Sequence, residues 1–246
     1  MYGVKLRLKI HLKSENNYKI PFNYNHILSS IIYNKIVDLD LAHKLHTSNS
    51  FKFFNFSQLN IPNRKIVKNG IIAKNGKINF YLSSPDDILI KNLVNGFVDD
   101  LEIKFKNEKL TVEKIEALKT PDFTEKSEFK TISPINIRDV NEENKRIDLA
   151  PSDKFFKGIE NNLIKKYCAF HDLESTNKKI KVYSEMANVK RKRVTIPKGP
   201  NTTHHRAYMM DIILEGDIDL IEFAYDVGLG EKNSMGFGMI KYIEQK

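Results

Sequence analysis

Residues 77–105 read KINFYLSSPDDILIKNLVNGFVDDLEIKF, and this stretch decides the fold class. Apolar and polar residues alternate over Lys77–Leu82 and again over Leu101–Phe105, as they do in half-buried strands. Between the two runs, apolar residues recur at the spacing of an amphipathic helix, and Ser83 or Ser84 is the expected N-cap. The stretch therefore predicts a strand, a helix and a second strand.

The rest of the first half extends this pattern in both directions. An alternating strand is expected over residues 2–12, and a helix is expected after Pro21, with Asn23 or Asn25 as its N-cap. Three further strands are expected over Phe51–Phe56, Ile71–Ala73 and Leu110–Ile115. The resulting order, β-α-β-β-α-β, is that of the ferredoxin-like fold.

The second half repeats this order after residues 119–128, which are polar, contain a proline and are interpreted as a linker. One helix is expected after the N-cap Ser152, and another after Asp217 or Asp219. The expected strands are Phe129–Ile137, Ile180–Val189, Val194–Ile196, Ala207–Glu215 and Met239–Ile243.

We therefore predict an α+β protein made of two tandem ferredoxin-like (RRM-like) βαββαβ domains. Residues 1–120 form the expected N-terminal domain, and residues 125–246 form the C-terminal one. Within the second domain, the basic run Lys190–Arg193 is expected to join two strands.

The composition excludes several classes of protein. No run approaches the roughly 18 apolar residues of a membrane span, and residues 1–12 alternate in polarity, unlike a signal peptide. The one cysteine, Cys168, excludes an internal disulfide and a cysteine-based zinc site, and it fits a reducing compartment. We expect a cytoplasmic protein with a sizeable core and no membrane partner.

The charge is unevenly distributed along the chain. The net charge is +9, but residues 178–206 alone carry nine Lys and Arg residues against the single acidic residue Glu185. Cations concentrated in this way indicate a surface that binds phosphate groups, although a solvated charged face remains the alternative.

Residues 228–238, GLGEKNSMGFG, form a glycine-rich segment between the last expected helix and the last expected strand. Glycine allows positive φ and close approach to a ligand, which can leave N–H groups available to phosphate. The spacing is neither that of a Walker loop nor that of the dinucleotide fingerprint, because Asn233 stands where a third glycine belongs. The residues of this segment by themselves are consistent with two roles, a phosphate-binding loop or an ordinary tight connection.

This segment resembles a known family. Gly-Leu-Gly, five residues and Gly-Phe-Gly resemble the C-terminal loop of the repeat-associated RNA-binding superfamily of CRISPR systems, and Gly230–Met239 resembles its branch that processes CRISPR precursor RNA. Residues 21–26, PFNYNH, and Ile31–Asn34 are similar to the first helix of that branch. So is Leu45-His46, six residues before Lys52 and its aromatic strand.

The resemblance implies a metal-independent endoribonuclease that cuts each repeat by attack of a 2′-hydroxyl and leaves 5′-hydroxyl and 2′,3′-cyclic phosphate ends. In the matching branch a tyrosine, a histidine and a lysine carry out the reaction, and these positions match Tyr33, His46 and Lys52. The chemistry requires proton transfer to and from oxygen and stabilisation of an anionic phosphorane, for which these residue types are suited. No metal and no cofactor are expected.

Local evidence for the three positions is unequal. At about 100° per residue, Tyr33 lies about 20° from His26 and 40° from Ser29 on the first helix, so we expect an exposed tyrosine. On local evidence alone, His46 reads as an ordinary loop or helix-end histidine and Lys52 as a solvent-facing strand lysine. Only the family spacing assigns them a catalytic role.

The RNA-binding residues are expected in the second domain. They comprise the basic region and the glycine-rich segment: Lys190, Arg191, Lys192, Arg193, Lys198, Arg206, Gly228, Gly230, Lys232, Asn233, Ser234, Gly236 and Gly238. His204 and His205, at the edge of the basic region, are assigned no role.

The expected partner is CRISPR repeat RNA within its precursor, with an interference complex and a second copy of the chain as further candidates. One alternative is a family member that holds processed CRISPR RNA, or a structural subunit of an interference complex, without cutting. A second is a ferredoxin-like module that binds a nucleotide or a protein, which would leave the Tyr–His–Lys spacing unexplained. A conventional RNA-recognition motif is disfavoured, because no aromatic consensus stands on a central strand.

Overall fold

The computed structural model describes residues 6–15, 17–47, 51–105, 108–198 and 201–244. The chain divides into two compact units. The first comprises Met1–Ser50 and Ser57–Thr120, and the second comprises Phe51–Phe56 and Pro121–Lys246. Phe51–Phe56 therefore belongs with the C-terminal half, not with the N-terminal domain in which it was expected.

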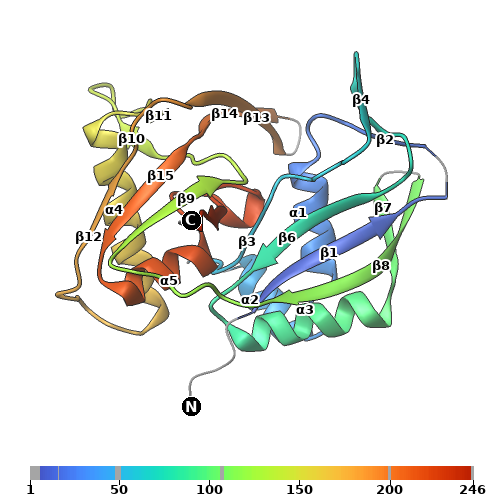
Figure 1. Cartoon of the computed structure of the whole chain (residues 1–246), viewed down its shortest axis with the longest axis horizontal. Coiled ribbons are helices and arrows are strands. Elements are labelled where there is room, and N and C mark those ends of the chain that lie inside the picture. Colours follow the sequence, from blue (N-terminus) through green and yellow to red (C-terminus); the bar gives the residue numbers. More distant parts are fainter. Residues whose placement is uncertain (1–5, 16, 48–50, 106–107, 199–200, 245–246) are drawn as a thin grey trace. The chain divides into compact units, whose positions relative to one another are not determined.

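Four strands of the first unit form an antiparallel array in the order β6-β1-β8-β7 (Figure 1). Their bounds are β1 Arg7–Lys13, β6 Ile78–Ser83, β7 Glu102–Phe105 and β8 Glu108–Leu118. A smaller sheet has the order β2-β5-β4, with β2 Tyr18–Ile20, β4 Arg64–Val67 and β5 Gly70–Ala73. The unit also contains helices α1 Asn25–Asn34, α2 Leu39–Thr47 and α3 Asp87–Asp99. The predicted strand–helix–strand of residues 77–105 is confirmed as β6, α3 and β7.

The caps of the first unit's helices differ from the expected ones. α3 begins after Asp86, whose carboxylate accepts hydrogen bonds from the amides of Ile88 (2.9 Å) and Leu89 (3.2 Å). Ser84, an expected cap, instead accepts a bond from the amide of Asp86 (3.0 Å) and shapes the turn before the helix. α1 has Tyr24 at its N-cap without a side-chain cap bond, so the prediction of Asn23 or Asn25 was wrong.

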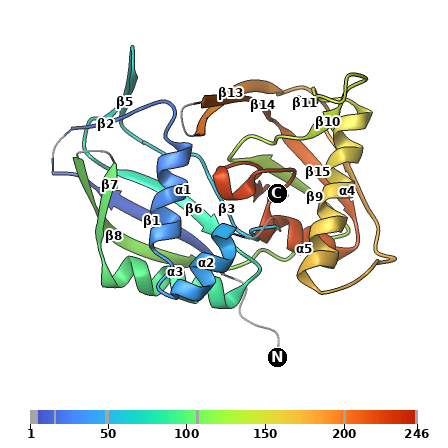
Figure 2. The same cartoon turned by 180° about the vertical axis from the view of Figure 1, so that it is seen from behind.

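The main sheet of the second unit has the order β12-β15-β9-β16 and is also antiparallel. Its strands are β9 Lys126–Thr131, β12 Ile180–Tyr183, β15 Asp211–Gly216 and β16 Ile240–Tyr242. Helices α4 Asp153–Phe170 and α5 Ile218–Val227 lie side by side against this sheet (Figures 1 and 2) and share its apolar core. The Ser152 hydroxyl caps α4 as predicted, accepting a bond from the amide of Phe155 (3.3 Å).

Two hairpins complete the second unit. They pair β10 Arg138–Val140 with β11 Arg146–Asp148, and β13 Lys190–Lys198 with β14 Asn201–Met209. The expectation of one strand over Ala207–Glu215 was wrong, because the chain changes partners at Met210: Met209 pairs with Lys190, whereas Asp211 pairs with Lys130. Alternation continues through this change of partner, so periodicity does not reveal it.

The basic run Lys190–Arg193 is the first half of strand β13 and not a connection between strands. Four consecutive cations read as a polar turn in the sequence, but the ladder to β14 fixes their backbone in an extended conformation. Successive side chains of the run therefore point to opposite faces of the hairpin.

The strand expected over Phe51–Phe56 is reduced to β3, Asn55–Phe56. Phe53 has a φ of 46°, which interrupts extended structure. Its ring packs edge-on against Phe170 of α4, with centroids 5.1 Å apart, and Asn55 donates a hydrogen bond to the carbonyl of Asp226 (2.6 Å). Tertiary contacts with the second unit thus decide the conformation of this segment.

Within the described residues, no helix combines the length and the apolar character needed to cross a membrane.

Candidate nucleic-acid interface

The glycine-rich loop, residues 228–238, connects α5 to β16 and depends on its glycines. Gly228, Gly230, Gly236 and Gly238 all have positive φ, between 68° and 82°. A Cβ added at Gly238 would lie 1.8 Å from the carbonyl oxygen of Leu229, and one at Gly230 would lie 2.5 Å from that of Asn136. Backbone therefore approaches backbone here more closely than any side chain allows.

Several amides of the loop already have partners inside the protein. Gly228 donates to Ala224 (2.9 Å), Gly236 to Asn233 (3.0 Å) and Gly238 to Pro134 (2.9 Å), in each case to a carbonyl oxygen. These three N–H groups are therefore not available to phosphate in this conformation. These three glycines therefore shape the loop, and they can contribute to binding only through the residues they present.

Two polar side chains hold the neck of the loop. Asn233 donates through Nδ2 to the carbonyls of Leu229 (3.1 Å) and Phe237 (3.0 Å). Lys166, a fully buried residue of α4, donates through Nζ to Gly228 O (2.5 Å) and to the Asn233 side chain (3.1 Å). Sequence reasoning missed Lys166, because a lysine in a helix normally indicates a solvent-facing position.

The half-exposed tip of the loop, Glu231–Met235, includes a short 3₁₀ turn, η1, Asn233–Met235. Glu231 is fixed by Arg138, whose Nε donates to it (2.7 Å) and whose backbone amide also donates (3.0 Å). Lys232 has a φ of 59°, and burial together with the neighbouring Arg138 lowers the pKa of its ammonium.

A hairpin that carries several cations lies next to the loop. Val194 and Ala207 of hairpin β13–β14 pack against Phe237 of the loop, with Met235 alongside. On the other face of the hairpin, Arg193 and Arg206 stand directly opposite each other in the ladder, and both are exposed. Directly opposed side chains on paired strands have Cβ atoms about 5 Å apart, so their like charges repel.

These cations border a hollow of about 600 Å³. Its lining residues come from the hairpin and from β11: Ile147, Asp148, Arg191, Lys192, Arg193, His204, His205 and Arg206. Asp148 is the only acidic residue of this lining, and it is engaged by the amide of Arg206 (2.7 Å) and the side-chain amide of Asn136 (2.8 Å). The arginine side chains of the hollow therefore present a net positive surface.

His205 links the hollow to the glycine-rich loop. Its ring lies edge-on to Phe237, with centroids 6.3 Å apart, and its Nδ1 is 3.7 Å from a carboxylate oxygen of Asp148. Burial and the nearby Lys232 lower the pKa of this imidazole, against the opposing effect of Asp148. Sequence reasoning left His205 unassigned, since nothing in its neighbourhood marks it as different from His204.

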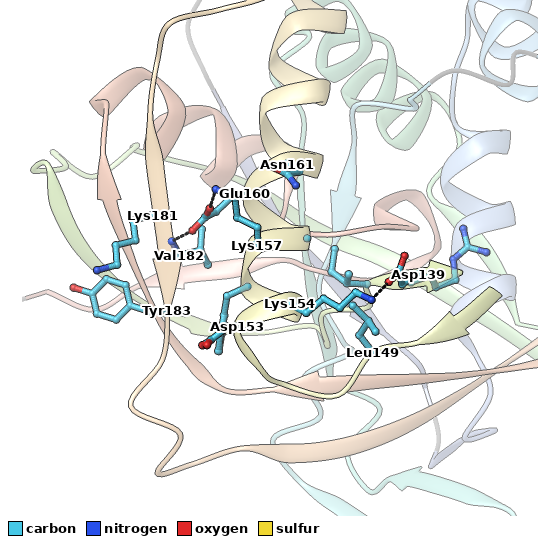
Figure 3. Close-up of a pocket in the computed structure, with 14 residues that line it drawn as sticks. Asp139, Leu149, Asp153, Lys154, Lys157, Glu160, Asn161, Lys181, Val182 and Tyr183 are labelled. Atoms are coloured by element: carbon cyan, nitrogen blue, oxygen red, sulfur yellow. Dashed lines mark hydrogen bonds and ion pairs between the residues drawn. The ribbon is translucent and has the colours of Figure 1, made fainter. Parts of the chain in front are cut away.

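A second pocket, of about 650 Å³, differs in its charge (Figure 3). It lies between α4, β12 and the β10–β11 hairpin, over an apolar floor that includes Leu149 and Val182. Two ion pairs form within it: Lys154 pairs with Asp139, and Lys157 pairs with Glu160 (2.8 Å). These matched pairs make it a weaker candidate for a polyanion than the arginine-lined hollow.

The three expected catalytic residues fall in both units. Tyr33 is in α1 and is half-buried, so the expectation of an exposed tyrosine was wrong; its helix neighbour Ser29 is buried. His46 is in α2, and its side chain lies outside the described residues. Lys52 belongs to the second unit, half-buried between Phe51 and Phe53, and burial lowers the pKa of its ammonium.

Of the other expected residues, Lys190, Arg191 and Lys192 are exposed on β13, whereas the side chain of Lys198 lies outside the described residues. Among the residues that the structure describes, no cluster of three His, Cys, Asp or Glu side chains could hold a metal ion.

Models of one known family match both halves of the chain. Residues 19–116 match the model of the CRISPR-associated protein Cas6 N-terminal region, and residues 118–242 match that of the CRISPR associated protein Cas6 C-terminal region. The chain belongs to the Cas6 family. The two matched regions meet where the two compact units divide, near Thr120.

Individual Cas6 relatives match over nearly the full length. "CRISPR-associated endoribonuclease Cas6 1" of Methanocaldococcus jannaschii is 38% identical over 98% of this chain and 94% of its own length. "CRISPR-associated endoribonuclease Cas6" of Pyrococcus furiosus is 33% identical over 96% and 89%.

Solved structures agree with the family membership. One of a "CRISPR associated protein Cas6" superposes with a TM-score of 0.83 at 37% identity, covering 98% of this chain and all of the other. Another, titled "An RAMP protein binding different RNA substrates", gives 0.86 at 27% identity, covering 97% of this chain and all of the other. The antiparallel α+β architecture is thus that of Cas6 and RAMP structures.

Proposed function

We propose that this Cas6-family chain is an endoribonuclease that cleaves CRISPR precursor RNA within its repeats. The observation that carries the proposal is the arginine-lined hollow of hairpin β13–β14 beside the glycine-rich loop. RNA presents a regular array of phosphates, and exposed arginines bind phosphate through paired N–H donors. The endoribonuclease names of the two relatives above 30% identity support the same conclusion.

The proposal includes the fold. We take both units as ferredoxin-like. Apart from its two inserted hairpins, the second follows the order β9-α4-β12-β15-α5-β16, with sheet order β12-β15-β9-β16. In such a unit the first and third strands lie in the centre of the sheet, as β9 and β15 do. In the first unit the corresponding strands, β1 and β6, are likewise adjacent and antiparallel.

Phosphate contacts fall on the hairpin and the loop tip. Arg193 and Arg206 would bind one phosphate between them, which would relieve their mutual repulsion. Arg191 lies two residues along the same face of β13 and could contact the next phosphate. Lys190 and Lys192 alternate with these arginines along β13 and would add contacts from its other face. Lys198, and Lys232 and Ser234 of the tip, would supply further contacts.

The proposed chemistry is metal-independent attack of the 2′-hydroxyl on the adjacent phosphorus, with departure of the 5′-oxygen. His46 and Tyr33 would transfer the two protons, and Lys52 would stabilise the negative charge of the phosphorane. The products would be a 2′,3′-cyclic phosphate and a 5′-hydroxyl. Partial burial supports the role of Lys52, because a charge acts more strongly on a phosphate where less water surrounds it.

The test is incubation of the protein with labelled repeat RNA in the presence of EDTA. We expect one cut per repeat, with cyclic phosphate at the new 3′ end. A substrate carrying 2′-deoxyribose at the scissile nucleotide should bind with similar affinity and stay intact. Cleavage that requires a divalent metal, or cleavage of the deoxy substrate, would exclude the proposed reaction.

A subunit that binds RNA without cutting it is the second candidate. A relative 28% identical over 99% of this chain is named "Putative CRISPR-associated endoribonuclease-like protein Cas6", which leaves this role open in the family. Tight binding of the repeat with no product in the same assay would establish it. An interference complex and a second copy of the chain are then the partners to examine by co-purification and by light scattering.

A further inference from the structure

Lys166 occupies an unusual position in helix α4. Its side chain is 1% exposed, and its Nζ donates hydrogen bonds to Gly228 O (2.5 Å), Gly230 O (3.2 Å) and Asn233 Oδ1 (3.1 Å). All three acceptors belong to the glycine-rich loop. An ammonium group has three N–H donors, so its bonding capacity is matched by this one loop.

A buried lysine is costly, and the cost indicates a purpose other than core packing. Removing an ammonium from water is unfavourable unless hydrogen bonds compensate, and an apolar residue would fill the same volume without that penalty. Burial lowers the pKa of Lys166 to about 7, while Glu231 acts in the opposite direction. The bonds to the loop are what offset the burial.

Groups of the loop surround the Nζ of Lys166. The carbonyls of Gly228 and Gly230 point at Nζ, because positive φ at both glycines turns them inward. Asn233 accepts from Nζ and donates to the carbonyls of Leu229 and Phe237 on the two arms of the loop. Lys166 and Asn233 together bind four carbonyl groups of the neck.

We propose that Lys166 is a positioning residue for RNA binding, holding the neck of the glycine-rich loop so that its tip is presented beside the arginine-lined hollow. The inference rests on the proposed RNA-binding function of that surface. Lys166 itself is buried beneath the loop and acts only through it. What it positions is Lys232 and Ser234 of the tip, and Met235 and Phe237, which pack against the hairpin.

The first experiment requires no RNA. Hydrogen exchange is measured on wild type, Lys166→Met and the matched control Lys165→Met, which changes the adjacent exposed lysine of α4. We expect Lys166→Met to speed exchange in residues 228–238 by about tenfold or more, with β9 and β15 unchanged, and Lys165→Met to leave the loop as in wild type. Equal loop protection in all three proteins would overturn the inference.

Asn233→Ala is the second variant, and it covers the outcome in which Lys166→Met fails to fold. Its side chain is half-exposed, and its removal takes away the bond to Nζ and both bonds to the neck. The same acceleration of loop exchange is expected. Where both variants fold, the double variant should lose less loop protection against hydrogen exchange than the sum of the losses in the two single variants. This is expected because Lys166 and Asn233 act as one unit.

The second experiment measures affinity and cleavage of labelled repeat RNA. Lys166→Met should weaken binding about tenfold and raise KM by a similar factor, with kcat within about threefold, because the catalytic groups are elsewhere. Lys165→Met should change the dissociation constant by less than about threefold. An affinity equal to that of the control would overturn the positioning role. Absence of RNA binding by wild type would instead overturn the proposed function, and the exchange measurement would still decide whether Lys166 holds the loop.

Discussion

At the scale of single residues, the neighbouring environment determines what each titratable side chain can do. Lys52 and Lys166 are both lysines whose pKa is lowered by burial, yet their surroundings differ. Lys52, which Phe51 and Phe53 flank in the sequence, is only half-buried, whereas Lys166 is fully buried under the loop. We assign electrostatic stabilisation to the first and loop positioning to the second for this reason.

His46→Ala should slow cleavage of repeat RNA by about 10²–10⁴-fold, the range expected for loss of a general acid or base. Binding should stay within about threefold of wild type, because the substitution leaves the proposed phosphate-binding cations in place. The measurement is single-turnover cleavage with a filter-binding titration alongside. His43→Ala, on the exposed side of the same helix, is the matched control and should cut normally. Wild-type cleavage by the His46 variant would remove that residue from the mechanism.

The titration of Lys166 predicts a pH dependence of stability. Its pKa of about 7 in the folded protein is below the ordinary value of 10.5, so between these values the unfolded chain binds more protons. The contribution of this group to the free energy of unfolding therefore rises as pH increases from about 7 to 10.5. Between pH 7 and pH 9, the free energy of unfolding measured in urea should rise more for wild type than for Lys166→Met. No such gain is expected relative to Lys165→Met, and a constant difference from Lys166→Met would contradict the prediction.

At the scale of elements, the β13–β14 hairpin combines two opposing requirements. One face packs on the glycine-rich loop through Val194 and Ala207, and the other presents Arg193 opposite Arg206. Pairing like charges in this way weakens the hairpin, which is consistent with a surface kept for binding an anion. The alternation of side chains along a strand allows one hairpin to meet both requirements.

The double variant Arg193→Ala/Arg206→Ala should weaken repeat RNA binding by about tenfold or more at moderate salt. The slope of log affinity against log salt should also become shallower by about 1 to 2, because two phosphate contacts are lost. The same variant without RNA should be at least as stable as wild type, since a repulsive pair is removed. Binding at several salt concentrations checks the first part, and thermal unfolding checks the second. Lys165→Ala, which removes an exposed cation of α4, is the control, and an unchanged slope in the double variant would exclude the hairpin as the phosphate surface.

At the scale of the whole molecule, residues 51–56 belong to the second unit, although the chain on both sides of them, up to Ser50 and from Ser57, belongs to the first. The ring contact of Phe53 with Phe170 and the bond from Asn55 to Asp226 fasten the segment to α4 and α5. β3 also lies against the 3₁₀ turn of the glycine-rich loop. Lys52 is therefore carried by the unit that holds the proposed RNA-binding surface.

Phe53→Ala should loosen this attachment. We expect the free energy of unfolding to fall by about 2–3 kcal/mol, less than for a fully buried ring because Phe53 is half-buried. Hydrogen exchange should accelerate at the last turn of α4, where Phe170 loses its neighbour. Phe22→Ala, at a ring 48% exposed in the first unit, is the control and should have a small effect. Unchanged protection of α4 would show that the segment is not held by this ring.

The sequence by itself determined the elements whose cause is local. The alternation over residues 77–82, the apolar spacing of α3 and the Ser152 cap of α4 all follow from short-range rules and were predicted. The glycines of the loop could also be recognised, since positive φ leaves few other choices. Family resemblance added the three proposed catalytic positions, which local patterns alone did not distinguish.

Only the tertiary structure decided the features in which distant residues compete for the same groups. The strand break at Met210 depends on pairing with Lys190 before it and with Lys130 after it. The assignment of Phe51–Phe56 to the second unit depends on contacts with Phe170 and Asp226. The glycine-rich loop was expected to offer its amides to phosphate, but packing gave several of them to the protein's own carbonyls. Its neck is held by Lys166, more than 60 residues earlier in the chain. Burial and hydrogen-bond satisfaction are properties of the folded molecule, so no local pattern can assign them.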